Sequence, residues 1–77
     1  MNKQRRARID RMHEQVTALS EVVEALQEEE QESYDNLPES LQEAERGESM
    51  QEAIYALDEA MEALNQAADS LLEAVGS

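Results

Sequence analysis

Hydrophobic side chains recur at alternating spacings of three and four residues over two long stretches of the chain. This spacing places them along one side of an α-helix, at positions a and d of a heptad repeat. The first stretch predicts a helix over about residues 3–31, and the second predicts a helix over about residues 50–75. The first seam consists of Ile9, Met12, Val16, Leu19, Val23 and Leu26, and the second of Met50, Ile54, Leu57, Met61, Leu64, Ala68, Leu71 and Val75.

Local signals mark the ends of the second helix. Ser49 and Glu52 have the S-x-x-E spacing of a capping box, in which each side chain accepts a hydrogen bond from a free backbone N–H. Gly76 lies where a glycine commonly ends a helix. These signals predict a helix that begins directly after Ser49 and stops at Gly76.

The connection over residues 32–48 contains turn-forming residues. Asn36 is expected to cap a short helix over about residues 38–45, with Pro38 at an early helical position. Gly47 is expected to break this helix before the second long one begins. The sequence therefore predicts one all-α domain, an antiparallel two-helix hairpin about 40 Å long.

The second helix has a wider apolar surface than one partner helix needs. Ala53, Ala60, Ala67 and Ala74 occupy every g position beside its seam. Because a lone hairpin leaves one side of each seam exposed, we expect two copies to dimerise into a four-helix bundle. The alternative is an oligomerising adaptor that docks on a different helical protein through this alanine-rich face.

Composition narrows the fold class further. The chain has no Cys, Phe or Trp, one Pro and two Gly, so it lacks disulfides, thiol nucleophiles and most strand-forming residues. All-β and α/β folds are therefore not expected. No apolar stretch approaches the roughly 18 residues of a membrane span, so the sequence favours a cytoplasmic protein without a membrane partner.

Charge is divided unevenly along the chain, whose formal net charge is −13. Residues 1–11 have a net charge of +4, whereas residues 12–77 have 18 acidic residues against Arg46 alone. Such a surface repels phosphate polymers and anionic lipids, so direct binding of nucleic acid is not expected.

Few residues have the spacing that catalysis or metal binding requires. The run from Glu28 to Glu32 contains E-E-x-x-E, which is similar to the magnesium motif of all-α nucleotide pyrophosphatases, but the second acidic helix of those enzymes is missing. His13 is the only histidine, and its acidic neighbours Asp10 and Glu14 point away from the seam. The sequence therefore predicts no enzyme activity, no metal and no cofactor.

The acidic surface is the best candidate for function. Carboxylates along a helical rod can imitate DNA and block the basic nucleic-acid channel of another protein. The alternative is a solvated surface that only keeps the bundle soluble, although unmixed acids four residues apart exceed what solubility requires. The expected contact residues are Glu52, Asp58, Glu59, Glu62 and Asp69 on the second helix, with Asp35, Glu39, Glu43 and Glu48 near the loop.

One segment of the chain is similar in sequence to a group of known proteins. The elements Y-D-N-L-P-E-S-L-Q, which begins at Tyr34, and E-R-G-E, which begins at Glu45, resemble a set of small acidic proteins of bacteriophages and prophages. The likeness spans about residues 28–72. It implies a helical hairpin from a phage, acting in the bacterial host cytoplasm as an inhibitor of a nucleic-acid enzyme or of a defence system, as anti-CRISPR proteins do.

Overall fold

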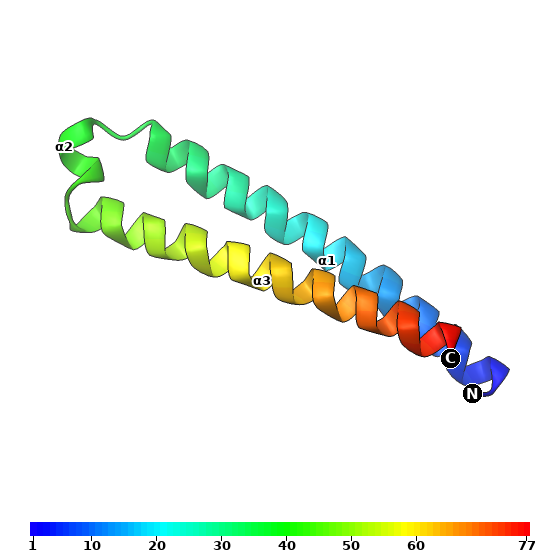
Figure 1. The fold of residues 1–77 in the computed structure, drawn as a ribbon. Helices are drawn as coiled ribbons and strands as arrows, with labels where there is room; N and C mark the ends of the chain where they lie inside the picture. The colour runs from blue at the N-terminus through cyan, green and yellow to red at the C-terminus, as the bar shows by residue number, and fades with distance from the viewer.

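A computed structural model describes all 77 residues as three helices, α1 (Lys3–Asp35), α2 (Glu39–Gln42) and α3 (Glu45–Gly76). The long helices α1 and α3 lie side by side and antiparallel, with α2 joining them at one end and both termini at the other (Figure 1). The predicted all-α hairpin with a short connecting helix is confirmed. Its greatest extent is 58 Å, longer than predicted because both long helices exceed their expected ends.

Helix α1 runs four residues further than the heptad seam predicts. It begins after Asn2, whose side-chain oxygen accepts a hydrogen bond from Arg5 N at 2.7 Å. Its last turn is stabilised by a 3.0 Å hydrogen bond from Gln31 Nε2 to Asp35 Oδ1. Asn36 is the C-cap of α1, so its predicted role as the cap of the short helix was wrong. That cap position is taken by Pro38, which makes no side-chain capping bond.

Helix α3 begins at Glu45, five residues before its predicted start. Ser49 and Glu52 therefore lie inside the helix, and the predicted capping box was wrong. Acidic side chains at Glu45 and Glu48 lie in the first turn, where the helix dipole favours negative charge. Gly76 is the last helical residue and does not have a positive φ angle, so it is not the left-handed stop that the sequence indicated.

Gly47 lies in the first turns of α3 and is buried there, instead of breaking the chain as predicted. A Cβ atom at this position would collide with the backbone oxygen of Gln42, at the end of α2. Gln42 also donates a 3.0 Å hydrogen bond from Nε2 to the backbone oxygen of Tyr34. The absence of a side chain at Gly47 thus allows α2 to fold tightly against α3.

The interface between α1 and α3 is thin. Ile54, which is 8% exposed, is the one buried hydrophobic side chain. On α3 the other seam residues are half-buried, as the a/d pattern predicts: Met50, Leu57, Met61, Leu64, Ala68, Leu71 and Val75.

Helix α1 uses only part of its predicted seam against α3. The a residues Ile9, Val16 and Val23 are half-buried. The d residues stay largely open to solvent, with Met12 45%, Leu19 54% and Leu26 47% exposed. Residues at position e take their place against α3, so α1 is rotated about its axis relative to the expected a/d packing.

The close approach at Gly47 leads to a stability prediction. Gly47→Ala should lower the free energy of unfolding by about 1–3 kcal/mol, because a methyl group would collide with the Gln42 backbone. Thermal unfolding followed by circular dichroism measures this change. Gly76→Ala is the matched control, since a Cβ there has no atom within 4 Å. Equal melting temperatures for both variants would contradict the proposed role of Gly47.

Candidate interaction surfaces

Two polar pairs join the long helices on one side of the hairpin. Ser20 Oγ donates to Asn65 Oδ1 at 2.8 Å, and Gln51 Nε2 donates to the Tyr34 hydroxyl at 3.0 Å. The pairs are 14 residues apart on both helices, in opposite directions, which is two heptads. They therefore fix one register, in which the e positions of α1 and α3 meet on the same side.

The same register places Gln27 opposite Asp58, midway between the two polar pairs, and both side chains are half-buried. Asp58 thus belongs to the helix interface, so its predicted place on the outward acidic surface was wrong. Its e position explains the difference, since position e of α3 borders α1. His13 also occupies an e position and is half-buried.

Sequence reasoning missed this polar side. The relevant signal is the recurrence of polar side chains at every e position of the first helix: Arg6, His13, Ser20, Gln27 and Tyr34. A row of polar residues beside an apolar seam reads as a solvated helix edge. Only the paired helix shows that Ser20, at 8% exposure, is among the most buried residues of the chain.

The opposite side of the hairpin is apolar and uncovered. In an antiparallel pair whose e positions meet on one side, the d row of α1 and the g row of α3 lie on the other. This apolar side carries exposed residues from both helices (from α1 Met12, Leu19, Val22 and Leu26, and from α3 Ala53, Ala60 and Ala67).

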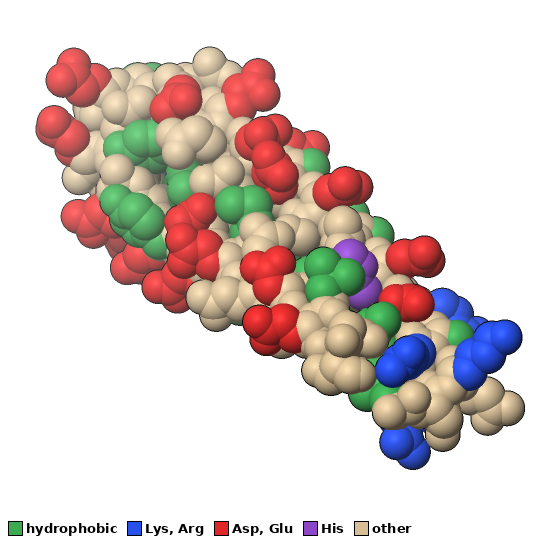
Figure 2. Space-filling model, turned by 45° about the vertical axis from the view of Figure 1, so that its right-hand side comes forward, with side chains coloured by type: hydrophobic (Ala, Val, Ile, Leu, Met, Phe, Trp, Pro, Cys, Tyr) green, Lys and Arg blue, Asp and Glu red, His purple; other side chains and the backbone are tan.

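Carboxylates cover much of the remaining surface. Figure 2 shows acidic side chains along most of the length of the rod, with exposed hydrophobic groups between them and the basic residues gathered at one end. Apart from Asp58, every expected contact acid is exposed: Asp35, Glu39, Glu43, Glu48, Glu52, Glu59, Glu62 and Asp69.

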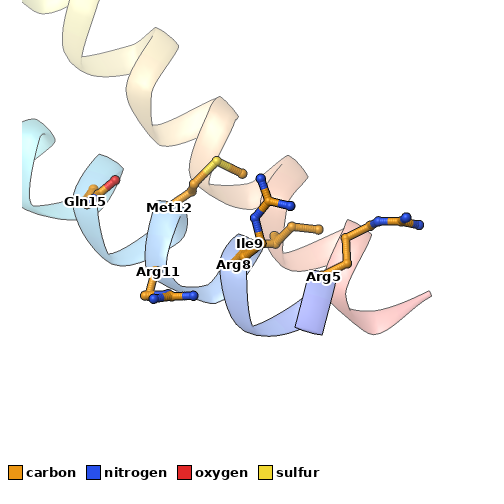
Figure 3. Close-up of a pocket in the computed structure, with 6 residues that line it drawn as sticks. All are labelled: Arg5, Arg8, Ile9, Arg11, Met12 and Gln15. Carbon is orange, nitrogen blue, oxygen red and sulfur yellow. The ribbon is translucent and has the colours of Figure 1, made fainter. Parts of the chain in front are cut away.

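The basic end is formed by the first turns of α1. Arg5, Arg8 and Arg11 surround an open groove of about 650 Å³ whose apolar lining is Ile9 and Met12 (Figure 3). All of its lining residues come from this one helix. None of the three arginines makes a side-chain hydrogen bond. The groove is therefore an unpartnered surface that combines positive charge with apolar contact area.

The structure adds two findings on chemistry. No group of three or more His, Asp or Glu side chains is arranged to hold a metal ion. None of the helices has an apolar stretch of the length needed to cross a lipid bilayer. The features that stand out are thus three surfaces: the acidic surface, the apolar side and the basic groove.

The chain matches no protein-family model, no curated protein and no solved structure. The likeness to phage proteins therefore stays a prediction.

The Ser20–Asn65 hydrogen bond gives a second testable prediction. In a double-mutant cycle, Ser20→Ala and Asn65→Ala should show a coupling energy of about 0.5–1.5 kcal/mol, because each change removes the same bond. Chemical unfolding of the four chains measures this coupling. Ser70→Ala is the control, since Ser70 is exposed and should not couple to Asn65→Ala. A coupling energy near zero between Ser20 and Asn65 would contradict the assigned bond.

Proposed function

We propose that this chain is a non-enzymatic protein-binding inhibitor whose acidic surface imitates DNA and occupies a nucleic-acid channel of a basic protein. The observation that supports the proposal most directly is the exposure of carboxylates along most of a narrow rod whose Cα atoms span 58 × 14 × 12 Å. A rigid array of this shape fits a channel that is built to hold an extended polyanion.

The density of charge supports the comparison with DNA. The basic first turns of α1, residues 3–11, take up about 14 Å of the rod, which leaves about 44 Å for the acidic part. A net charge of −17 over that length is one charge per roughly 2.6 Å, whereas duplex DNA has one per about 1.7 Å. The two densities are close enough for the same basic channel to attract both.

The electrostatics also indicate the class of partner. A field of one sign over most of the molecule speeds association with a basic protein and opposes contact with nucleic acid or anionic membranes. The resemblance to phage proteins agrees with this choice and points to a bacterial host protein, such as a nucleic-acid enzyme or a defence nuclease of the kind that anti-CRISPR proteins block, in the host cytoplasm.

We also propose that the active form is a homodimer that packs as a four-helix bundle. Ile54 alone forms the buried hydrophobic core of the single hairpin, which is very little apolar burial for 77 residues. The exposed apolar side supplies the surface that a second copy would cover.

A second candidate is the oligomerising adaptor, which would place a helix of another protein on the apolar side instead. The exposed alanines Ala53, Ala60 and Ala67 favour it, because small side chains allow close helix contact. The two functions use different surfaces, so substitutions separate them.

The inhibitor function predicts the behaviour of an acidic triple variant, Glu59→Gln, Glu62→Gln and Asp69→Asn. Proteins captured by the immobilised chain from a bacterial lysate should be nucleic-acid-binding proteins that duplex DNA elutes. The variant should keep its helix content, since all three residues are exposed, and should bind the captured protein at least tenfold more weakly with a smaller salt dependence.

A second variant, Ala60→Glu with Ala67→Glu, tests the apolar side, which the adaptor function and the proposed dimer share. In the adaptor function this pair should abolish docking by placing charges in a buried interface, while the acidic triple variant should have little effect. An affinity that the triple variant leaves unchanged at two ionic strengths would reject mimicry through this part of α3.

The homodimer predicts a solution mass of twice the 8.7 kDa of one chain at micromolar concentration. Light scattering on a sizing column measures it. The melting temperature should also rise with protein concentration, because association stabilises the folded state. A monomer mass with a concentration-independent melting temperature would contradict the dimer.

A further inference from the structure

One face of α1 changes its character along the helix in a self-complementary way. This face consists of the exposed c, d and g positions, which lie next to one another around the helix. It begins with Arg5, Arg8 and Arg11, continues with Met12, Leu19, Val22 and Leu26, and ends with Glu29 and Glu32. The order is basic, then apolar, then acidic, with the apolar part in the middle.

We propose that this face binds the same face of a second copy in antiparallel orientation, with the two-fold axis near Leu19. The inference rests on the proposed dimer and specifies its interface and orientation. Met12 and Leu26 each lie seven residues from Leu19, about 10.5 Å along the helix, so Met12 of one chain meets the partner's Leu26. Leu19 meets the partner's Leu19.

The charged residues of this face are also placed symmetrically about Leu19. Arg8 lies 11 residues before Leu19 and Glu29 lies 10 residues after it, about 16 and 15 Å along the axis. Arg8 therefore lies beside the partner's Glu29, and Arg5 lies beside the partner's Glu32. Because the interface is symmetric, each contact occurs twice.

The basic groove at the end of α1 fits this occupant. Its apolar lining, Ile9 and Met12, receives the partner's Leu26, while Arg5, Arg8 and Arg11 border the groove at the level of the partner's acids. In Figure 3 the arginines and the two apolar side chains belong to successive turns of the same helix. The groove thus offers one contact for an apolar group and several for carboxylates.

A parallel arrangement of the two α1 helices is excluded by the same distribution of charge. It would place arginines against arginines at one end and glutamates against glutamates at the other, which is unfavourable at both. The antiparallel arrangement also neutralises the basic end, so that the dimer presents acids over nearly all of its surface. This result agrees with the proposed inhibitor function.

Charge reversal tests the contact. Glu29→Arg with Glu32→Arg should weaken dimerisation at least tenfold at low salt, because arginines would then face the partner's Arg5 and Arg8. Glu21→Arg with Glu24→Arg is the matched control, with the same charge change and spacing on exposed b and f positions. It should leave the dimer unchanged or strengthen it by lowering the net negative charge. Analytical ultracentrifugation measures both dissociation constants, and circular dichroism checks that each variant is helical.

The complementary variant completes this test. Arg5→Glu with Arg8→Glu should also weaken the homodimer, whereas an equimolar mixture of the two reversed chains should form a heterodimer more tightly than either forms a homodimer. In that heterodimer all facing charges are opposite. Equal weakening by the control variant, or a mixture that stays unassociated while both chains are helical, would overturn the assigned contacts.

A distance measurement tests the orientation independently. The chain has no cysteine, so Ser33→Cys provides a single site for a spin label. In the antiparallel dimer the two labels lie about 42 Å apart, because each is 14 residues from Leu19 on opposite sides of the axis. A dimer with labels within about 20 Å would overturn the antiparallel interface but not the proposed dimer, whereas a monomer would overturn both.

Discussion

Two helices packed side by side shield only one strip of each other, and this geometric limit governs the whole molecule. The strip of α3 that faces α1 holds most of the large hydrophobic side chains of this helix, yet Ile54 is the one hydrophobic residue that becomes buried. Hydrophobic stabilisation is roughly proportional to the apolar area removed from water, so a hairpin of this kind gains little of it. Several large apolar groups outside the strip, including Met12, Leu19 and Leu26, remain exposed for a further contact.

Polar contacts decide which side of the hairpin stays available for that contact. The bonds of Ser20 with Asn65 and of Tyr34 with Gln51 hold the e rows of both helices together, and this turns the d row of α1 toward solvent. Gly47 adds a constraint at the loop, where its missing side chain lets α2 approach α3. The hairpin therefore has one polar side that is satisfied within the chain and one apolar side that is not.

The heptad spacing was sufficient to predict the all-α hairpin, because few structures other than packed α-helices have an apolar period of 3.5 residues. It did not determine the rotation of α1 about its axis. The a/d face and the a/e face of this helix differ by only one row of side chains, and a serine such as Ser20 is not expected at an interface from the sequence alone. The helix ends were also mispredicted. Ser49 and Glu52 have the spacing of a capping box, but the helix already begins at Glu45. These two residues therefore lie inside the helix and not at its N-terminus. Of the candidate contact acids, only Asp58 was misplaced, for the same rotational reason.

The strong negative charge limits how two such hairpins can associate. Pairing doubles a net charge of −13, so the apolar contact must outweigh long-range repulsion, which is weakest when opposite charges are brought close together. The only concentrated positive charge lies within residues 1–11, at the end of the rod away from the loop. An arrangement that places the two basic ends together brings like charges close to each other. An antiparallel arrangement places each basic end beside acidic residues of the other copy, so the favourable contact occurs twice. The uneven distribution of charge along the chain therefore determines how two hairpins are oriented, while the apolar middle of α1 supplies the affinity.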